Sequence, residues 1–201
     1  MSSFSVLYSM KKLVFFILVT ISIQSCNTPS YVFSNNSQKT YSFPEGTYLL
    51  NIIDAPESVR LELRELIFDK LEDRIPDGKL VSIQDTSVTL INSQPGFNNS
   101  AEYLEQLSSR AKGYDYFINI KAEKPADDLG SLQIGNIDPG EANVTKVSLE
   151  IINLNEKVSV YNSHVRSELK VPDDSKDFAF SVSAQSMMKN SLKKILKRMK
   201  N

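Results

Sequence analysis

The residue best placed for covalent chemistry is Cys26, the only cysteine among the 201 residues. A basic pair at 11–12 and an apolar run over 13–23 precede it. This layout is typical of a secretory signal peptide, and the run is shorter than the roughly 20 apolar residues that a bilayer-spanning helix needs. We therefore predict a signal peptide over 1–25, with Met10 as an alternative true start.

The sequence Ile23-Gln24-Ser25-Cys26 resembles the lipobox of bacterial lipoproteins, in the looser form found in Bacteroidetes. This resemblance implies that Cys26 becomes the first mature residue and carries acyl chains such as palmitate. One acyl chain binds a bilayer only marginally, so the two or three chains of such proteins give durable anchoring. An acylated Cys26 leaves no thiol for disulfides or thiolate metal sites. The alternatives are a secreted protein with a chance cysteine, or a buried apolar N-terminus.

The remaining candidates for chemistry are few. His164 is the only histidine, and zinc sites and Ser-His-Asp triads need partners that the sequence does not indicate. We expect a solvent-facing strand residue there. Asp127, Asp128 and Asp138 lie among glycines and offer oxygens to Ca²⁺, but their spacing does not fit an EF-hand loop. We predict no catalytic residue, no metal and no cofactor.

Charge and composition exclude further classes of function. The chain has 23 basic and 24 acidic residues, and removing the basic pair at 11–12 leaves a mature net charge near −3. Nucleic-acid binding favours a strongly basic domain, so we predict none. The sequence also lacks the glycine-rich patterns that cradle phosphates.

The mature chain is predicted to consist of a tether and one domain. Residues 26–43 are rich in Asn, Ser and Thr, a composition that buries too little apolar surface to fold alone. We therefore predict a lipidated flexible tether over 26–43 and a single globular domain over 44–201. The tether has no acidic residue, whereas surface-exported lipoproteins of the Bacteroidetes often carry an acidic cluster after the cysteine. The absence of such a cluster favours the periplasmic face, and we predict a lipid-anchored protein of the cell envelope, at the outer membrane and facing the periplasm.

Hydrophobic periodicity in the domain predicts an α+β fold with about three helices on a mixed sheet. The predicted order is β-α-β-α-β-β-α, and right-handed crossovers would put the first two helices on one face. Residues 88–91 either continue the second strand or pair with it. The predicted strands are 47–53, 79–84, 114–122, 144–154 and 158–171, and the predicted helices are 58–75, 99–112 and 178–199.

Two segments resemble small envelope domains related to the amino-terminal domain of TolB and to curli-secretion lipoproteins. One is Gly113-Tyr-Asp-Tyr-Phe-Ile-Asn-Ile120, which resembles the entry into their third strand. The other is the hairpin over 147–160, although its turn is Asn155-Glu156 instead of Thr-Gly. The resemblance implies binding to other envelope proteins, or assembly, rather than catalysis.

Two features could contact a partner. The polar loop over 123–143 carries four apolar side chains, and we predict partner contacts there, with burial against the same domain as the alternative; they are Leu129, Leu132, Ile134 and Ile137. The last helix carries basic residues without an acid among them. This pattern fits a solvated face near the helix C-terminus, and the alternative is contact with anionic lipid or an acidic partner.

We therefore expect a membrane-anchored cell-envelope lipoprotein with a non-enzymatic binding or assembly role. Its partners would be the bilayer, through acylated Cys26, and an envelope protein of unknown identity. The alternative is an envelope hydrolase whose catalytic carboxylates the sequence does not single out, because such residues can lie far apart in the chain.

Overall fold

The computed structural model describes residues 28–34, 40–76, 78–89, 99–124, 142–170 and 183–199. Their helices and strands confirm the predicted α+β class, and the predicted order β-α-β-α-β-β-α begins at the second strand. The strands are β1 (Ser30–Phe33), β2 (Tyr48–Leu50), β3 (Leu80–Ser82), β4 (Tyr116–Glu123), β5 (Ala142–Asn153) and β6 (Val158–Lys170). The helices are α2 (Glu57–Leu71), the 3₁₀-helix η1 (Ile83–Asp85), α3 (Ala101–Arg110) and α4 (Ala184–Arg198).

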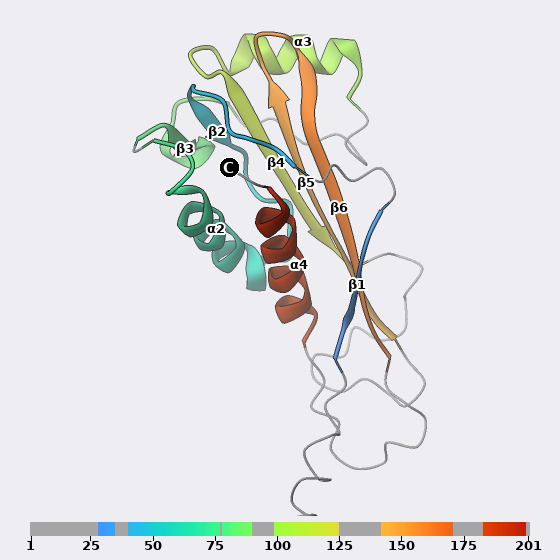
Figure 1. Ribbon diagram of the computed structural model, residues 1–201. Coiled ribbons are helices and arrows are strands. Elements are labelled where there is room, and N and C mark those ends of the chain that lie inside the picture. Colours follow the sequence, from blue (N-terminus) through green and yellow to red (C-terminus); the bar gives the residue numbers. More distant parts are fainter. Residues whose placement is uncertain are drawn as a thin grey trace, which may run out of the picture.

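The six strands form one mixed sheet in the order β1-β6-β5-β4-β2-β3 (Figure 1). β2 pairs in parallel with β3 and β4, whereas β4, β5, β6 and β1 pair antiparallel. The predicted hairpin is present, and the side chain of Asn153 fixes its turn by accepting hydrogen bonds from the backbone N–H groups of Asn155 and Glu156, both at 3.0 Å. The sequence left open whether residues 88–91 continue the second strand or pair with it, and in the structure Val88 belongs to no strand.

The prediction of a flexible tether over 26–43 is wrong for part of that segment. Ser30–Phe33 form β1, an edge strand that pairs with Val165–Glu168 of β6. Tyr31 and Phe33 alternate toward the core, and further along the chain Tyr41 and Phe43 pack against the same core. The overall polar composition hid these four aromatic side chains, and the alternation of one strand is too short to stand out from it.

The prediction that the first two helices share a face is also wrong. α2 packs with α4 on one face of the sheet, whereas α3 packs on the other. Figure 1 shows α2 and α4 side by side, with α3 near the end where β5 and β6 are joined. The strand order β4-β2-β3 is the reason. The chain steps outward from β2 to β3 and then back to β4, so two right-handed crossovers place their helices on opposite faces.

The main core lies between the sheet and the pair α2 and α4. The apolar residues that predicted α2 are all buried there; they are Val59, Leu63, Leu66, Ile67 and Leu71. Under α4 the sheet presents small hydroxyl residues, and the buried Oγ atom of Ser167 lies 2.6 Å from Thr145 Oγ1 and 3.3 Å from Ser191 Oγ. The second cluster joins α3 to the sheet through residues such as Leu107, Phe117 and Ile152.

Candidate functional site

The residues predicted to carry function lie outside the described part of the chain. These are Cys26 and the loop residues Leu129, Leu132, Ile134 and Ile137. The acids Asp127, Asp128 and Asp138, for which no metal site was predicted, also lie outside it. The described residues still fix where those segments join the sheet. Ser30 pairs with Glu168, and Glu168 pairs with Val144. The segment that carries Cys26 therefore enters the sheet at the same end at which β5 begins.

The first candidate binding feature is the edge of β6 to which β1 pairs. Tyr31 and Phe33 point toward α4, where Lys194 Nζ lies 4.6 Å from the Tyr31 ring centroid and Arg198 Cζ lies 3.8 Å from that of Phe33. Such cation–π contacts contribute about 0.5–1 kcal/mol at exposed sites. Val32 points to the opposite face and is 61% exposed. The backbone of Val165–Glu168 together with the Lys194 and Arg198 side chains is called here the β1-binding edge.

These contacts bear on the basic face predicted for the last helix. Lys194 and Arg198 cover the aromatic side chains of β1, and Lys189 Nζ lies 2.9 Å from Glu62 Oε2 on α2. Three of the basic residues of α4 thus contact their own domain. Contact of the remaining ones with anionic lipid stays a prediction.

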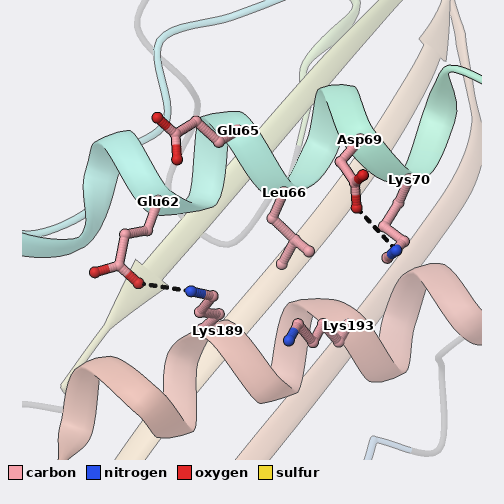
Figure 2. A pocket seen from close by; sticks show the side chains of 7 residues that line it. All are labelled: Glu62, Glu65, Leu66, Asp69, Lys70, Lys189 and Lys193. Carbon is pink, nitrogen blue, oxygen red and sulfur yellow. Dashed lines mark hydrogen bonds and ion pairs between the residues drawn. The ribbon is translucent and has the colours of Figure 1, made fainter.

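The second candidate feature is a groove of about 290 Å³ between α2 and α4. Figure 2 shows Glu62 directed at Lys189, Asp69 directed at Lys70, and Leu66 between the two helices. Exposed ion pairs contribute little to stability, with a median of about 0–1 kcal/mol. The groove holds carboxylates and ammonium groups but no nucleophile beside a base, so its chemistry is that of charge pairing. The complete lining is Glu62, Glu65, Leu66, Asp69, Lys70, Lys189 and Lys193.

A third feature, which the sequence did not reveal, is the buried carboxyl group of Glu150 on β5. Its Oε1 atom accepts a hydrogen bond of 2.8 Å from Asn99, just before α3, and the residue is 0% exposed. Its Oε2 atom, the Tyr103 hydroxyl and the Asn119 Nδ2 atom have no hydrogen-bond partner among the described residues. Burial raises the pKa of Glu150, and the nearby polar side chains of Ser159, Asn99 and Asn119 oppose that rise.

This environment favours the uncharged acid over the carboxylate. The full burial of Glu150 denies a substrate access to the group, so it does not form an active site in this conformation. In the sequence, Glu150 sits where strand alternation indicates a solvent-facing position. The residues that cover Glu150 lie in α3 or just before it. We predicted that α3 would share a face of the sheet with α2, which would leave Glu150 uncovered.

His164 differs from the solvent-facing residue that we predicted. It is half-buried, and its Nδ1 atom lies 2.7 Å from the Ser148 hydroxyl on β5. Burial lowers the pKa of His164, and the charge of Lys146 lowers it further. The hydroxyl contact connects two neighbouring strands.

The described residues contain neither a metal-binding cluster nor a membrane-spanning helix. No group of three or more His, Cys, Asp or Glu side chains is arranged to hold a metal ion in this part of the protein. Among the helices of the same residues, none combines the length and the apolar character needed to cross a membrane.

Comparison with known proteins gives structural neighbours only. No protein-family model and no curated protein matches the sequence. Solved structures with a similar chain trace include a dodecamer of a PelC variant from Paraburkholderia phytofirmans, with a TM-score of 0.45, 12% identity, and coverage of 86% of this chain and 98% of that one. Another is the hypothetical protein CT253 from Chlamydia trachomatis, with a TM-score of 0.40, 11% identity, and coverage of 77% and 95%.

A lipoprotein is also among these neighbours. It is GNA1162 from Neisseria meningitidis, with a TM-score of 0.37, 14% identity, and coverage of 62% of this chain and 84% of that one. At such low identities and TM-scores the likeness assigns neither a family nor a function to this chain.

Proposed function

We propose that this chain is a cell-envelope lipoprotein, anchored in a bilayer through acylated Cys26, whose α+β domain has a non-enzymatic binding or assembly role. The observation that carries the proposal is the position of Cys26. It follows a basic pair and an apolar run, and it lies four residues before Ser30, the first residue of the sheet. A lipid attached there presents the domain at a membrane surface.

Chain geometry limits how far the domain can be from that surface. Two residues of extended chain span at most about 7 Å, which is the reach from Cys26 to Thr28. While β1 is paired with β6, the end of the sheet at Ser30 and Glu168 would therefore lie close to the lipid headgroups. The opposite end, with the β5–β6 turn and α3, would point away from the bilayer and be open to partners.

The anchor is tested by labelling cells with an alkyne analogue of palmitate and by separating membranes from soluble protein. The wild-type protein should carry the label and sediment with membranes. Cys26→Ser should lose the label and appear in the soluble fraction. Ser25→Ala is the matched control, because it keeps a small residue before the cysteine and should behave as wild type. A Cys26→Ser protein that keeps the label would contradict the proposal.

The binding role is tested by placing a photo-crosslinking amino acid at exposed apolar positions in intact cells. Leu61 and Val32 are suitable, because they are 63% and 61% exposed. We expect at least one position to give a defined adduct with an envelope protein, reproduced with the two purified proteins. If no adduct forms and the purified protein turns over a cell-wall or glycan substrate, the hydrolase alternative is correct instead.

A further inference from the structure

The β1-binding edge has the features of a site for an extended peptide. It pairs with all four residues of β1, from Ser30 opposite Glu168 to Phe33 opposite Val165, and the next N–H, that of Ser34, donates to the His164 carbonyl at 3.1 Å. Backbone pairing of this kind accepts many sequences, and selectivity comes from alternate side chains. Here the alternate side chains are the two aromatic rings that Lys194 and Arg198 cover.

β1 is also held more weakly than the long central strands β4, β5 and β6. It is only four residues long, it pairs with one neighbour, and each of its side chains is exposed or half-buried. None of the fully buried residues of the core belongs to β1, whose two rings are only half-buried where they pack against it. Short edge elements with few buried contacts belong to the least stable parts of a protein.

We propose that the β1-binding edge is an exchangeable strand-docking site. β1 occupies it in the free protein, and an extended segment of a partner protein with aromatic side chains at positions i and i+2 replaces β1. The partner segment pairs with Val165–Glu168 and places its two rings beneath Lys194 and Arg198. This inference deepens the proposed binding role by defining the partner's chemistry, and it does not depend on acylation of Cys26.

The chain connection explains why an incoming segment must compete. Only five residues separate Ser34 from Thr40, where the described chain resumes. A connection this short keeps a tethered strand near its site at an effective concentration of about millimolar. Weakening β1 should therefore strengthen the binding of a free peptide to the same edge.

The experiment uses the purified full-length chain and a fluorescent peptide with the sequence of residues 28–34, followed by anisotropy. The double substitution Tyr31→Ala and Phe33→Ala should bind the peptide at least tenfold more tightly than wild type, because its own strand no longer competes. Val32→Ala is the matched control, since Val32 points to the other face, and it should bind as weakly as wild type. A peptide with Ala at both aromatic positions should not bind.

The proposal would be overturned if the double variant bound no peptide. It would also be overturned if the peptide that lacks aromatic side chains bound equally well. A wild-type dimer that forms with increasing concentration and is lost in the double variant would instead place β1 of a second copy at this edge. A Cys26→Ser protein should bind the peptide as wild type does, so failure of the anchor and failure of this site are distinguishable.

A second measurement keeps the test decisive if the double variant does not fold. In the wild-type protein, hydrogen exchange should be at least tenfold faster for the amides of β1 than for the paired amides of β5 and β6. Equal protection of the three strands would mean that β1 is not exchangeable, and the proposal would fail.

Discussion

The buried acid Glu150 makes the stability of the domain depend on pH, and Glu150→Gln should remove that dependence. Glu150 is 0% exposed, and only its Oε1 atom has a hydrogen-bond donor among the described residues, at 2.8 Å on Asn99. Burial raises its pKa in the folded state. Glutamine has nearly the same shape and can keep the contact with Asn99, but it never becomes charged.

The sign of the effect follows from proton binding. The ordinary pKa of the group is 4.5, so above that pH the unfolded chain has lost its proton while the folded chain still holds it. The folded state then binds more protons, and stability falls as pH rises from about 4.5 to the raised pKa. Each unit of pKa difference corresponds to about 1.4 kcal/mol. A buried group left without a hydrogen-bond partner costs about 1–3 kcal/mol, and we expect a pH-dependent loss of that order.

The measurement is urea unfolding of wild type and Glu150→Gln at a series of pH values from 4 to 8. The variant should gain stability relative to wild type as pH rises, by about 1–3 kcal/mol over the range. Glu156→Gln, the same substitution at an exposed turn position of the same hairpin, should follow wild type at every pH. Parallel curves for wild type and Glu150→Gln would refute the reasoning, because they would mean that Glu150 titrates alike in both states.

Three further predictions concern stability. Leu63→Ala should lower the free energy of unfolding by about 2–5 kcal/mol because Leu63 is fully buried. Leu61→Ala, on the exposed side of α2, should change it by less than about 0.5 kcal/mol. Equal losses in urea unfolding would contradict the packing of α2. Ser100→Ala should cost about 1 kcal/mol, since Ser100 Oγ caps α3 by accepting from the Tyr103 N–H at 3.1 Å; Ser109→Ala in the exposed part of α3 is the control, and a greater loss there would contradict the cap. Asp115→Asn should destabilise by about 1 kcal/mol at neutral pH, because Asp115 Oδ2 accepts from the Thr47 N–H at 2.8 Å and from its hydroxyl at 2.9 Å. These bonds lower the pKa of Asp115. The stabilisation is therefore present above the ordinary pKa of 3.8 and is lost as pH falls through the lowered pKa. A difference between Asp115→Asn and wild type that persists in acid would contradict this account.

Local patterns in the sequence were sufficient for most of the fold. Five apolar residues of α2 recur at helical spacing, and the structure buries all five; they are Val59, Leu63, Leu66, Ile67 and Leu71. Predicted and observed ends of β6 differ by a single residue, and Ser100 caps α3 near the predicted start of that helix. These features depend on contacts within a few residues, where propensity and periodicity act directly.

What the sequence did not predict depends on distant contacts. The face to which α3 packs follows from the strand order, and no local pattern encodes that order. For the same reason Glu150 resembled a solvent-facing strand residue, because the cover over it comes from Asn99 and Tyr103, far away along the chain. β1 was missed because two aromatic residues at alternate positions stand within a polar segment.

β1 lies between Cys26, the proposed lipidation site, and the core, and this position links the two proposals. With β1 docked, Thr28 is only two residues beyond Cys26, so an acylated Cys26 would hold the domain within about 7 Å of the lipid attachment. With β1 displaced by a partner strand, the free chain extends from Cys26 to Thr40. These 14 residues reach about 50 Å when extended. Binding of a partner at the β1-binding edge would therefore also release the domain from the membrane surface, because one strand cannot be docked and serve as tether at the same time.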